Sequence, residues 1–357
     1  MVAALAGCGT QDVVPEREAA DALARGEEVY LDHCVGCHGV AGDGRGPAAT
    51  RLLTKPRDFR QGTFKFHSTS PGALPTDEDL IRVTTLGIPY TSMQPYADLP
   101  LRDRAAVVQY VKTFSSRWRS SGARVSLPPP PEPADARTRQ GVEKGRAAYG
   151  RAMCKQCHGV AGDAKGVLAH ALIDDWGDHT NPADFTLGMF KSGPRRADAV
   201  RTIMTGLNGT AMASFADVLD EGEAWYLVAY LRSFARPIET REHLAALLLA
   251  RDYPDAFARH VGEPTPEAAR ALALRGSDID AEKQCMKCHS VGSMQARRSN
   301  DWHVAHFADP RSVVPLSRMP AFPSLLDENG TPNADGLATI AYIQATALPN
   351  PRNVDSE

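Results

Sequence analysis

Apolar residues recur with a helical period along much of this chain and mark helices separated by irregular segments. The segments 26–33, 107–111 and 224–234 each place apolar residues on one face of a helix, because residues three and four apart lie side by side. The segments 244–248 and 268–274 predict two further helices. A run of about 20 apolar residues, as a membrane-spanning helix requires, occurs nowhere. We therefore predict no transmembrane helix.

Two kinds of irregular segment interrupt these helices. Residues 127–133 are mostly proline, which favours an extended, semi-rigid linker. Residues 39–47 are rich in glycine, which argues against regular structure. A phosphate-binding loop would need Gly-Lys-Ser/Thr, which is missing, so we expect this loop to wrap closely around a bound group.

The length of the chain limits the number of domains, and its net charge limits the kinds of partner. A chain of 357 residues should form two or three domains. The formal net charge is −3, so the composition gives no support for nucleic-acid binding.

A Cys-x-x-Cys-His motif occurs three times. In a helical turn the two sulfurs share a face and the imidazole lies beside them. The thiols can add to the vinyl groups of one haem, while the histidine takes an axial position on the iron. The sequence therefore predicts three covalently bound haems c, held by Cys34, Cys37 and His38, by Cys154, Cys157 and His158, and by Cys285, Cys288 and His289.

Structural zinc and redox dithiols are the competing interpretations of these cysteines. A zinc ribbon pairs two Cys-x-x-Cys units about 15 to 20 residues apart. Here the first cysteines of successive motifs, 34, 154 and 285, lie 120 and 131 residues apart, and each motif ends in histidine. The spacing favours haem over both alternatives.

A second repeated pattern predicts the other axial ligand. Met93, Met212 and Met319 each follow a hydroxyl residue by two positions and precede an aromatic residue by three. A buried methionine is more often a packing residue. One such methionine per motif favours ligation of iron by its sulfur, and His303 and His306 are alternative ligands for the third haem.

The first two haem segments look like copies of each other. The ten residues 34–43 match 154–163 closely, and 56–65 match 182–191 in their Pro-x-Asp-Phe start and Phe-Lys end. Duplication is the simplest explanation. Cationic residues near these segments are candidate partners for haem propionates, with solvated surface charge as the alternative: Arg57, Lys65, His67 and Lys191, and Arg311 in the third unit.

The Pro47 carbonyl is a candidate acceptor for the second ring nitrogen of His38, the contact that orients such a ligand. Val167 stands at the matching place of the second copy.

A first helix, a haem motif, a methionine loop and a closing helix together resemble the class I cytochrome c fold. The resemblance implies small all-α domains whose first and last helices cross, with Gly26, Gly145 and Gly276 at the crossings. Residues 301–320 resemble the mono-haem subunit of cbb-type haem-copper oxidases. We expect a signal remnant and lipid-anchored tether at 1–24, cytochrome c domains at 25–120, 138–236 and 269–352, a Pro-rich linker at 121–137 and a helical connector at 237–268.

Cys8 is the one cysteine outside the three motifs. It ends Leu-Ala-Gly-Cys, which resembles the site where a bacterial lipoprotein is cleaved and lipidated, although the segment before it is short and uncharged. A stray cysteine is the alternative. We expect a periplasmic lipoprotein held at a membrane surface through Cys8.

Histidine and methionine on both sides of an iron leave no position for a substrate. The sequence therefore predicts a carrier of single electrons between redox proteins rather than an enzyme. A subunit of a larger respiratory complex and a multihaem peroxidase are the alternatives. The sequence names neither the electron donor nor the acceptor.

Overall fold

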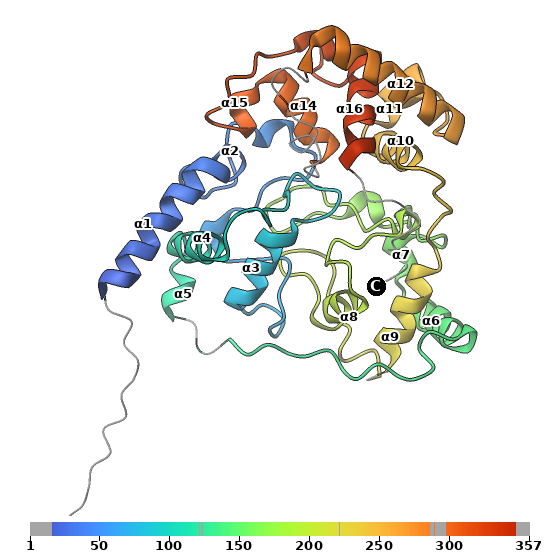
Figure 1. Ribbon diagram of the computed structural model, residues 1–357. Coiled ribbons are helices and arrows are strands. Elements are labelled where there is room, and N and C mark those ends of the chain that lie inside the picture. Colours follow the sequence, from blue (N-terminus) through green and yellow to red (C-terminus); the bar gives the residue numbers. More distant parts are fainter. Residues whose placement is uncertain are drawn as a thin grey trace, which may run out of the picture.

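The computed structural model describes residues 16–347, except 121, 123, 221, 286–288 and 290–297. These residues form helices and irregular segments, and the part described contains two isolated β-bridges but no strand. The all-α class is confirmed. Three helical units lie together, with the first in blue to teal, the second in green to yellow and the third in orange to red (Figure 1). None of the described helices is long and apolar enough to cross a bilayer.

The first unit is closed by two crossing helices, α1 (Glu16–His33) and α4 (Leu101–Thr113). A Cβ on Gly26 would collide with the Ala106 carbonyl, so only glycine allows this crossing. Because α1 begins at Glu16, residues 16–24, which we expected in a tether, are helical. The shorter elements are α2 (Val35–His38), η1 (Ala49–Arg51), η2 (Phe59–Gln61), α3 (Asp77–Leu86) and α5 (Arg117–Ser120).

The second unit repeats this plan around a core of its own. Its crossing helices are α6 (Arg139–Arg151) and α9 (Glu223–Arg232), which meet where Gly145 faces the Tyr226 carbonyl. Between them lie α7 (Lys155–His158), η3 (Ala169–Ala171), η4 (Phe185–Leu187) and α8 (Arg196–Thr205).

The third unit is larger because the expected connector packs onto it. Its crossing helices are α12 (Pro266–Lys283) and α16 (Ala334–Ala347), with Gly276 against the Ala338 carbonyl. The connector forms two helices that pack on α16 and share its core. The remaining elements are α10 (Arg241–Asp252), α11 (Pro254–His260), α14 (Asn300–Ala308), α15 (Pro310–Val313) and η6 (Pro323–Leu325).

A hydroxyl side chain caps the N-terminus of many of these helices. Each accepts a hydrogen bond from a backbone N–H of the first turn, which would otherwise have no partner. At α3 the contact is reciprocal, because Asp79 also accepts from the Thr76 backbone. The capping residues of α3, α6, α10, α12 and α14 are Thr76, Thr138, Thr240, Thr265 and Ser299.

The proline-rich linker is attached to both units that it joins. The Leu127 backbone N–H donates to the Ser68 carbonyl at 2.6 Å, on the first unit. The Trp225 indole N–H of the second unit donates to the Pro130 carbonyl at 2.7 Å. The linker therefore fixes the two units against each other instead of only spacing them.

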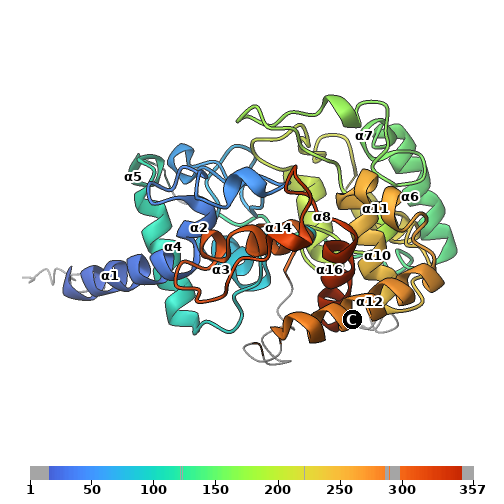
Figure 2. The ribbon, with the colours of Figure 1, turned by 90° about the horizontal axis from the view of Figure 1, so that it is seen from above.

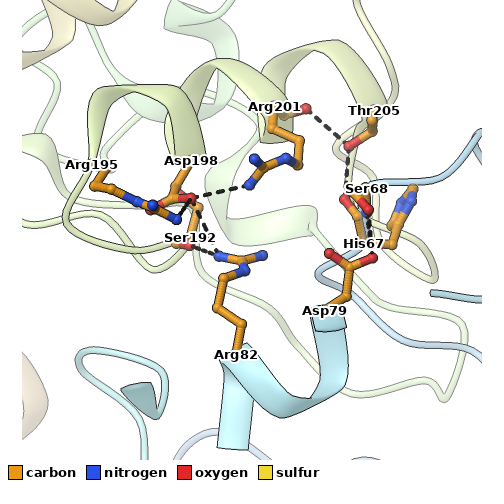
Figure 3. Close-up of polar contacts among 9 residues, drawn as sticks. All are labelled: His67, Ser68, Asp79, Arg82, Ser192, Arg195, Asp198, Arg201 and Thr205. Atoms are coloured by element: carbon orange, nitrogen blue, oxygen red, sulfur yellow. Dashed lines mark hydrogen bonds and ion pairs between the residues drawn. The ribbon is translucent and has the colours of Figure 1, made fainter. Parts of the chain in front are cut away.

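A buried charge network holds the first and second units together (Figure 3). Arg82 of α3 donates to the Ser192 carbonyl at 2.7 Å and lies 3.6 Å from the fully buried carboxylate of Asp198 on α8. Arg195 and Arg201 also pair with that carboxylate. Because a buried charge is costly without partners, this network makes the relative position of the two units specific.

The third unit covers the haem motif of the first. In Figure 1, α14 and α15 lie beside α2, and in both Figures 1 and 2 α7 lies far from α14. Trp302 and Val313 pack on Ala48 and Leu52, with Cys37 at the edge of the cluster. The Asp301 carboxylate accepts hydrogen bonds from the Leu53 backbone and the Ser92 hydroxyl, at 2.9 and 2.7 Å; both belong to the first unit.

Candidate functional site

The cysteine-histidine motifs adopt one backbone turn. In each, the histidine N–H donates to the carbonyl of the first cysteine: His38 to Cys34 at 2.9 Å, His158 to Cys154 at 2.9 Å and His289 to Cys285 at 3.0 Å. In the first two motifs this bond belongs to the helical turn that the motif predicts. Cys288 lies outside the described residues, as does Cys8.

In the first and second units, a tyrosine on the first helix of the unit holds the attachment turn in place. The Tyr30 hydroxyl donates to the Gly39 carbonyl, and the Tyr149 hydroxyl to the Gly159 carbonyl, both at 2.6 Å. Each tyrosine lies four residues after the glycine at its helix crossing. In the third unit the same count leads to Asp280, so this anchor is confined to the first two units.

A backbone carbonyl orients each of the first two histidines. Nδ1 of His38 donates to the Arg57 carbonyl, and Nδ1 of His158 to the Ala183 carbonyl, both at 3.1 Å. Pro47 does not play this role. In both units the acceptor directly follows the proline of the Pro-x-Asp-Phe segment. With Nδ1 engaged, Nε2 is the nitrogen left to bind a metal.

The aspartate and phenylalanine of this segment complete the support. Asp58 accepts from the Arg60 N–H, and Asp184 from the Thr186 N–H, which shapes the turn after the acceptor carbonyl. The phenylalanine rings, Phe59 and Phe185, stack on His38 and His158 with centroids 4.3 and 4.7 Å apart. The repeat was visible in the sequence, but its contact with histidine was not, because the residues lie about 20 positions away.

Burial keeps the two histidines neutral and these cysteine thiols protonated. It lowers the pKa of His38 to about 4 and also lowers that of His158, so both imidazoles are neutral and able to bind iron. Burial raises the pKa of Cys34 to about 12 and of Cys37 and Cys154 to about 11. Redox dithiols have lowered pKa values instead.

The geometry also disfavours zinc. Among the described residues no three His, Cys, Asp or Glu side chains are grouped as metal ligands. A structural zinc site needs four such ligands.

The three predicted methionines have the same local conformation. Each backbone N–H donates at 3.2 Å to the hydroxyl two residues earlier: Met93 to Thr91, Met212 to Thr210 and Met319 to Ser317. Met319 packs on the core of the third unit, together with Phe322.

One cavity of about 400 Å³ joins the first two sites. It lies between the units, and its walls are mostly apolar, as in cofactor pockets. The two thiols, the histidine and the methionine predicted for each site all face it. The side chains predicted to hold the two haems therefore line one cavity: Cys34, Cys37, His38, Met93, Cys154, Cys157, His158 and Met212.

Comparisons with known proteins agree with this geometry. A family model described as cytochrome c matches residues 23–115. A model described as cytochrome C oxidase, cbb3-type, subunit III matches residues 140–231. A search of curated proteins found no match.

A solved structure is also similar to this chain. It is a chain from the reducing HAO-like protein complex of Kuenenia stuttgartiensis, 38% identical, with a TM-score of 0.57. The alignment covers 59% of this chain and 96% of that one. The chain belongs to the class I c-type cytochromes. Cytochrome domains of this class bind haem c covalently and transfer electrons. Neither family model extends over the third unit of this cytochrome.

Cations of the cytochrome line the cavity between the first two sites. Arg57, Lys65 and Lys191 all face it. The Arg57 guanidinium lies 3.4 Å above the Trp176 ring, and Lys65 lies 3.9 Å from Asp174. Burial lowers the pKa of Lys191 to about 8, and repulsion from nearby cations adds to this. A buried ammonium favours an anionic partner, as haem propionates would be.

Two candidate propionate partners lie elsewhere. His67 is buried at the interface of the first two units, where its Nδ1 donates to the Thr69 carbonyl, and it does not line the cavity. The exposed Arg311 donates from Nε to the Ser317 carbonyl at 3.4 Å.

The alternative ligands of the third site lie on α14. Both histidines are buried, and burial lowers the pKa of His303 to about 3 and that of His306 to about 4. The His306 ring stacks on Trp302 with centroids 4.6 Å apart. The choice between Met319 and a histidine at the third haem stays a prediction.

Proposed function

We propose that this protein is a tri-haem cytochrome that carries single electrons between respiratory redox proteins at the outer face of a bacterial membrane. The observation that carries the proposal is the single cavity onto which two complete sets of cysteine, histidine and methionine side chains face. The third Cys-x-x-Cys-His motif, with the same backbone turn at His289, supports a third haem.

The side chains around the first two sites favour a carrier over an enzyme. A haem c bound there supplies an iron that alternates between two oxidation states. His38 and His158 are held by backbone carbonyls and present Nε2, and Met93 and Met212 provide sulfur from the loops that face the same cavity. If these histidines and methionines hold the two irons, no ligand position would remain for a substrate. The walls of the cavity are mostly apolar, which disfavours water beside the iron.

The packing of the units supports an order of electron transfer that differs from the order in sequence. The second unit shares a cavity with the first, and the third unit packs on the attachment loop of the first. The first haem would therefore adjoin both of the others, and α10 of the third unit also packs on Leu187 of the second.

A second candidate is an electron-transfer subunit of a larger complex. The similar solved chain comes from a protein complex, which favours this alternative. Mild solubilisation followed by gel filtration distinguishes the two. A free carrier elutes at the mass of one chain, whereas a subunit elutes with partners in constant ratio.

Attachment to the membrane rests on Cys8, outside the described residues. Growth with a radiolabelled fatty acid should label the wild-type protein and leave Cys8→Ser unlabelled. Equal labelling of both would exclude lipidation at this cysteine.

The test of the function is haem content and ligation. A pyridine haemochrome assay should give three haems c per chain, one per motif. Carbon monoxide should leave the wild-type spectrum unchanged, since no axial position is free. The variant Met212→Ala frees one axial position and should therefore bind carbon monoxide. Carbon monoxide binding by the wild type would favour the peroxidase-type alternative.

A further inference from the structure

The first and second units carry matching faces around their attachment turns, and within the described residues only the face of the first unit is covered. In the first unit, Ala48 donates its N–H to the Gly36 carbonyl, and in the second, Leu168 donates to the Gln156 carbonyl. These pairs are repeat-related. Ala48 is completely buried beneath the third unit, whereas Leu168 is 49% exposed. Figure 2 shows α14 beside α2, while α7 lies at the edge of the molecule.

The covered face depends on a close backbone approach. A Cβ on Gly36 would lie 2.6 Å from the Ser312 carbonyl of α15, closer than real contacts allow. Gln156 stands at the matching place in the second unit, so a partner cannot pack there as closely. The second face is therefore suited to a looser contact than the permanent one in the first unit.

The open face has an apolar centre. We define it by Met153, Gln156, Val167 and Leu168, which adjoin because the Gln156 N–H donates to the Met153 carbonyl and Leu168 bonds back to Gln156. Met153 is 64% exposed and Val167 is 70% exposed. Cys154 and Cys157, which the haem motif assigns to the second haem, are partly exposed beside it.

The rim of the open face is basic. Lys155 and Lys165 are exposed, and neither ammonium has an ion-pair partner within the described part of the chain. The nearby Asp163 carboxylate accepts the Lys165 backbone N–H at 3.3 Å. A second copy of this chain would bring its own lysines against these, which disfavours self-association.

We propose that the open face is the docking site for an acidic redox protein, which exchanges electrons with the haem of the second unit. This inference rests on the proposed function. The lysines attract an acidic partner over a distance, and the exposed apolar centre gives a small contact that dissociates readily, as turnover requires.

The experiment uses the reduced holoprotein and a small acidic blue-copper protein as the probe. Carbodiimide coupling, read by peptide mass spectrometry, should join Lys155 and Lys165 to carboxylates of the probe. The double variant Val167→Asp and Leu168→Asp should lose these cross-links, and its oxidation by the probe should slow roughly tenfold. Leu274→Asp, at an exposed position of α12, is the matched control and should behave as wild type.

Ferricyanide separates this inference from the proposed function. If the double variant is oxidised by ferricyanide as fast as wild type but slowly by the probe, docking is supported. Cross-links at other lysines, with a probe rate that the double variant leaves unchanged, overturn the docking face. Cross-links between two copies of the chain through Lys155 overturn the choice of partner. A haem spectrum that responds to neither ferricyanide nor dithionite overturns the proposed function itself.

Discussion

Two backbone carbonyls decide how the predicted axial histidines of the first two units are held. They belong to Arg57 and Ala183, whose side chains have nothing in common, so a comparison of side chains at these positions would miss them. Their position depends on the aspartate that follows, because this aspartate caps the next turn. The Pro-x-Asp-Phe repeat therefore serves to orient histidine.

Replacing Asp184 tests this support. Asp184→Ala removes the acceptor for the Thr186 N–H, which lies at 2.9 Å, and should cost about 0.5–2 kcal/mol of unfolding free energy. Asp184→Asn keeps an acceptor oxygen and should cost less. Guanidinium unfolding of the holoproteins measures both. Equal losses for the two variants would mean that the cap is unimportant.

Lys191 predicts a pH-dependent reduction potential for the second haem. Its pKa is lowered to about 8, chiefly by burial. Loss of the proton as the pH rises through that value removes a positive charge from the cavity. The ferric form is the more positive one, so the potential should fall over this range. Spectroelectrochemical titration between about pH 7 and about pH 9 measures it.

In Lys191→Met, the reduction potential of the second haem should be lower at neutral pH and should not fall stepwise between about pH 7 and about pH 9. Lys165→Met, which removes an exposed ammonium, is the control and should keep the step. A step of the same size in Lys191→Met would assign it to another group.

At the scale of elements, each unit is held by the crossing of its first and last helices. The distance between the helices is set by one glycine, since a carbonyl of the partner helix occupies the space of its missing side chain. The same helices carry the tyrosines that anchor the attachment turns in the first two units. Helix packing and haem attachment are thus coupled.

Substitution in α6 tests the crossing. Gly145→Ala places a methyl group against the Tyr226 carbonyl and should destabilise the protein by about 1–3 kcal/mol or more. Gly150→Ala, in the same helix, meets open space and should stabilise it by about 0.5–1 kcal/mol. Thermal unfolding of the holoproteins compares them. A tolerated Gly145→Ala would show that the helices can separate at little cost.

At the scale of the molecule, each of the three units packs on the other two, and Tyr90, Leu187 and Leu248 meet in one apolar cluster. The buried Asp198 network and the attached linker hold the second unit. Asp301 and Trp302 hold the third. Both residues lie in the stretch whose sequence resembles an oxidase subunit, and the structure gives them a role in joining units.

Gly36→Ala should weaken the packing of the third unit on the first. The added methyl group would meet the Ser312 carbonyl, and a backbone oxygen cannot rotate away as a side chain can. Small-angle scattering should show a larger radius of gyration, and proteases should cleave more readily between the second and third units. Gln156→Ala, at the matching place of the second unit, should change neither. An unchanged scattering profile for Gly36→Ala would show that the interface adapts.

Much of the fold and of each site could be predicted because it depends on short segments. A Cys-x-x-Cys-His turn spans five residues, and the hydroxyl-x-Met conformation spans three, so their geometry follows from local hydrogen bonds. The crossing glycines followed from resemblance to a family. The histidine-orienting carbonyl was wrongly placed at Pro47, because loop conformation decides which of several nearby carbonyls faces the ring.

The sequence by itself determined the cysteine, histidine and methionine pattern, the helical character and the duplication of the first two units, since these are properties of spacing and periodicity. Only the tertiary structure decided that two sites share one cavity, that the third unit covers the first haem motif, and that no other described segment covers the matching face of the second unit. Those features depend on contacts between residues far apart in the sequence; Leu53 and Asp301, for example, lie 248 positions apart. No local pattern encodes such contacts, because they arise from the fit of whole surfaces.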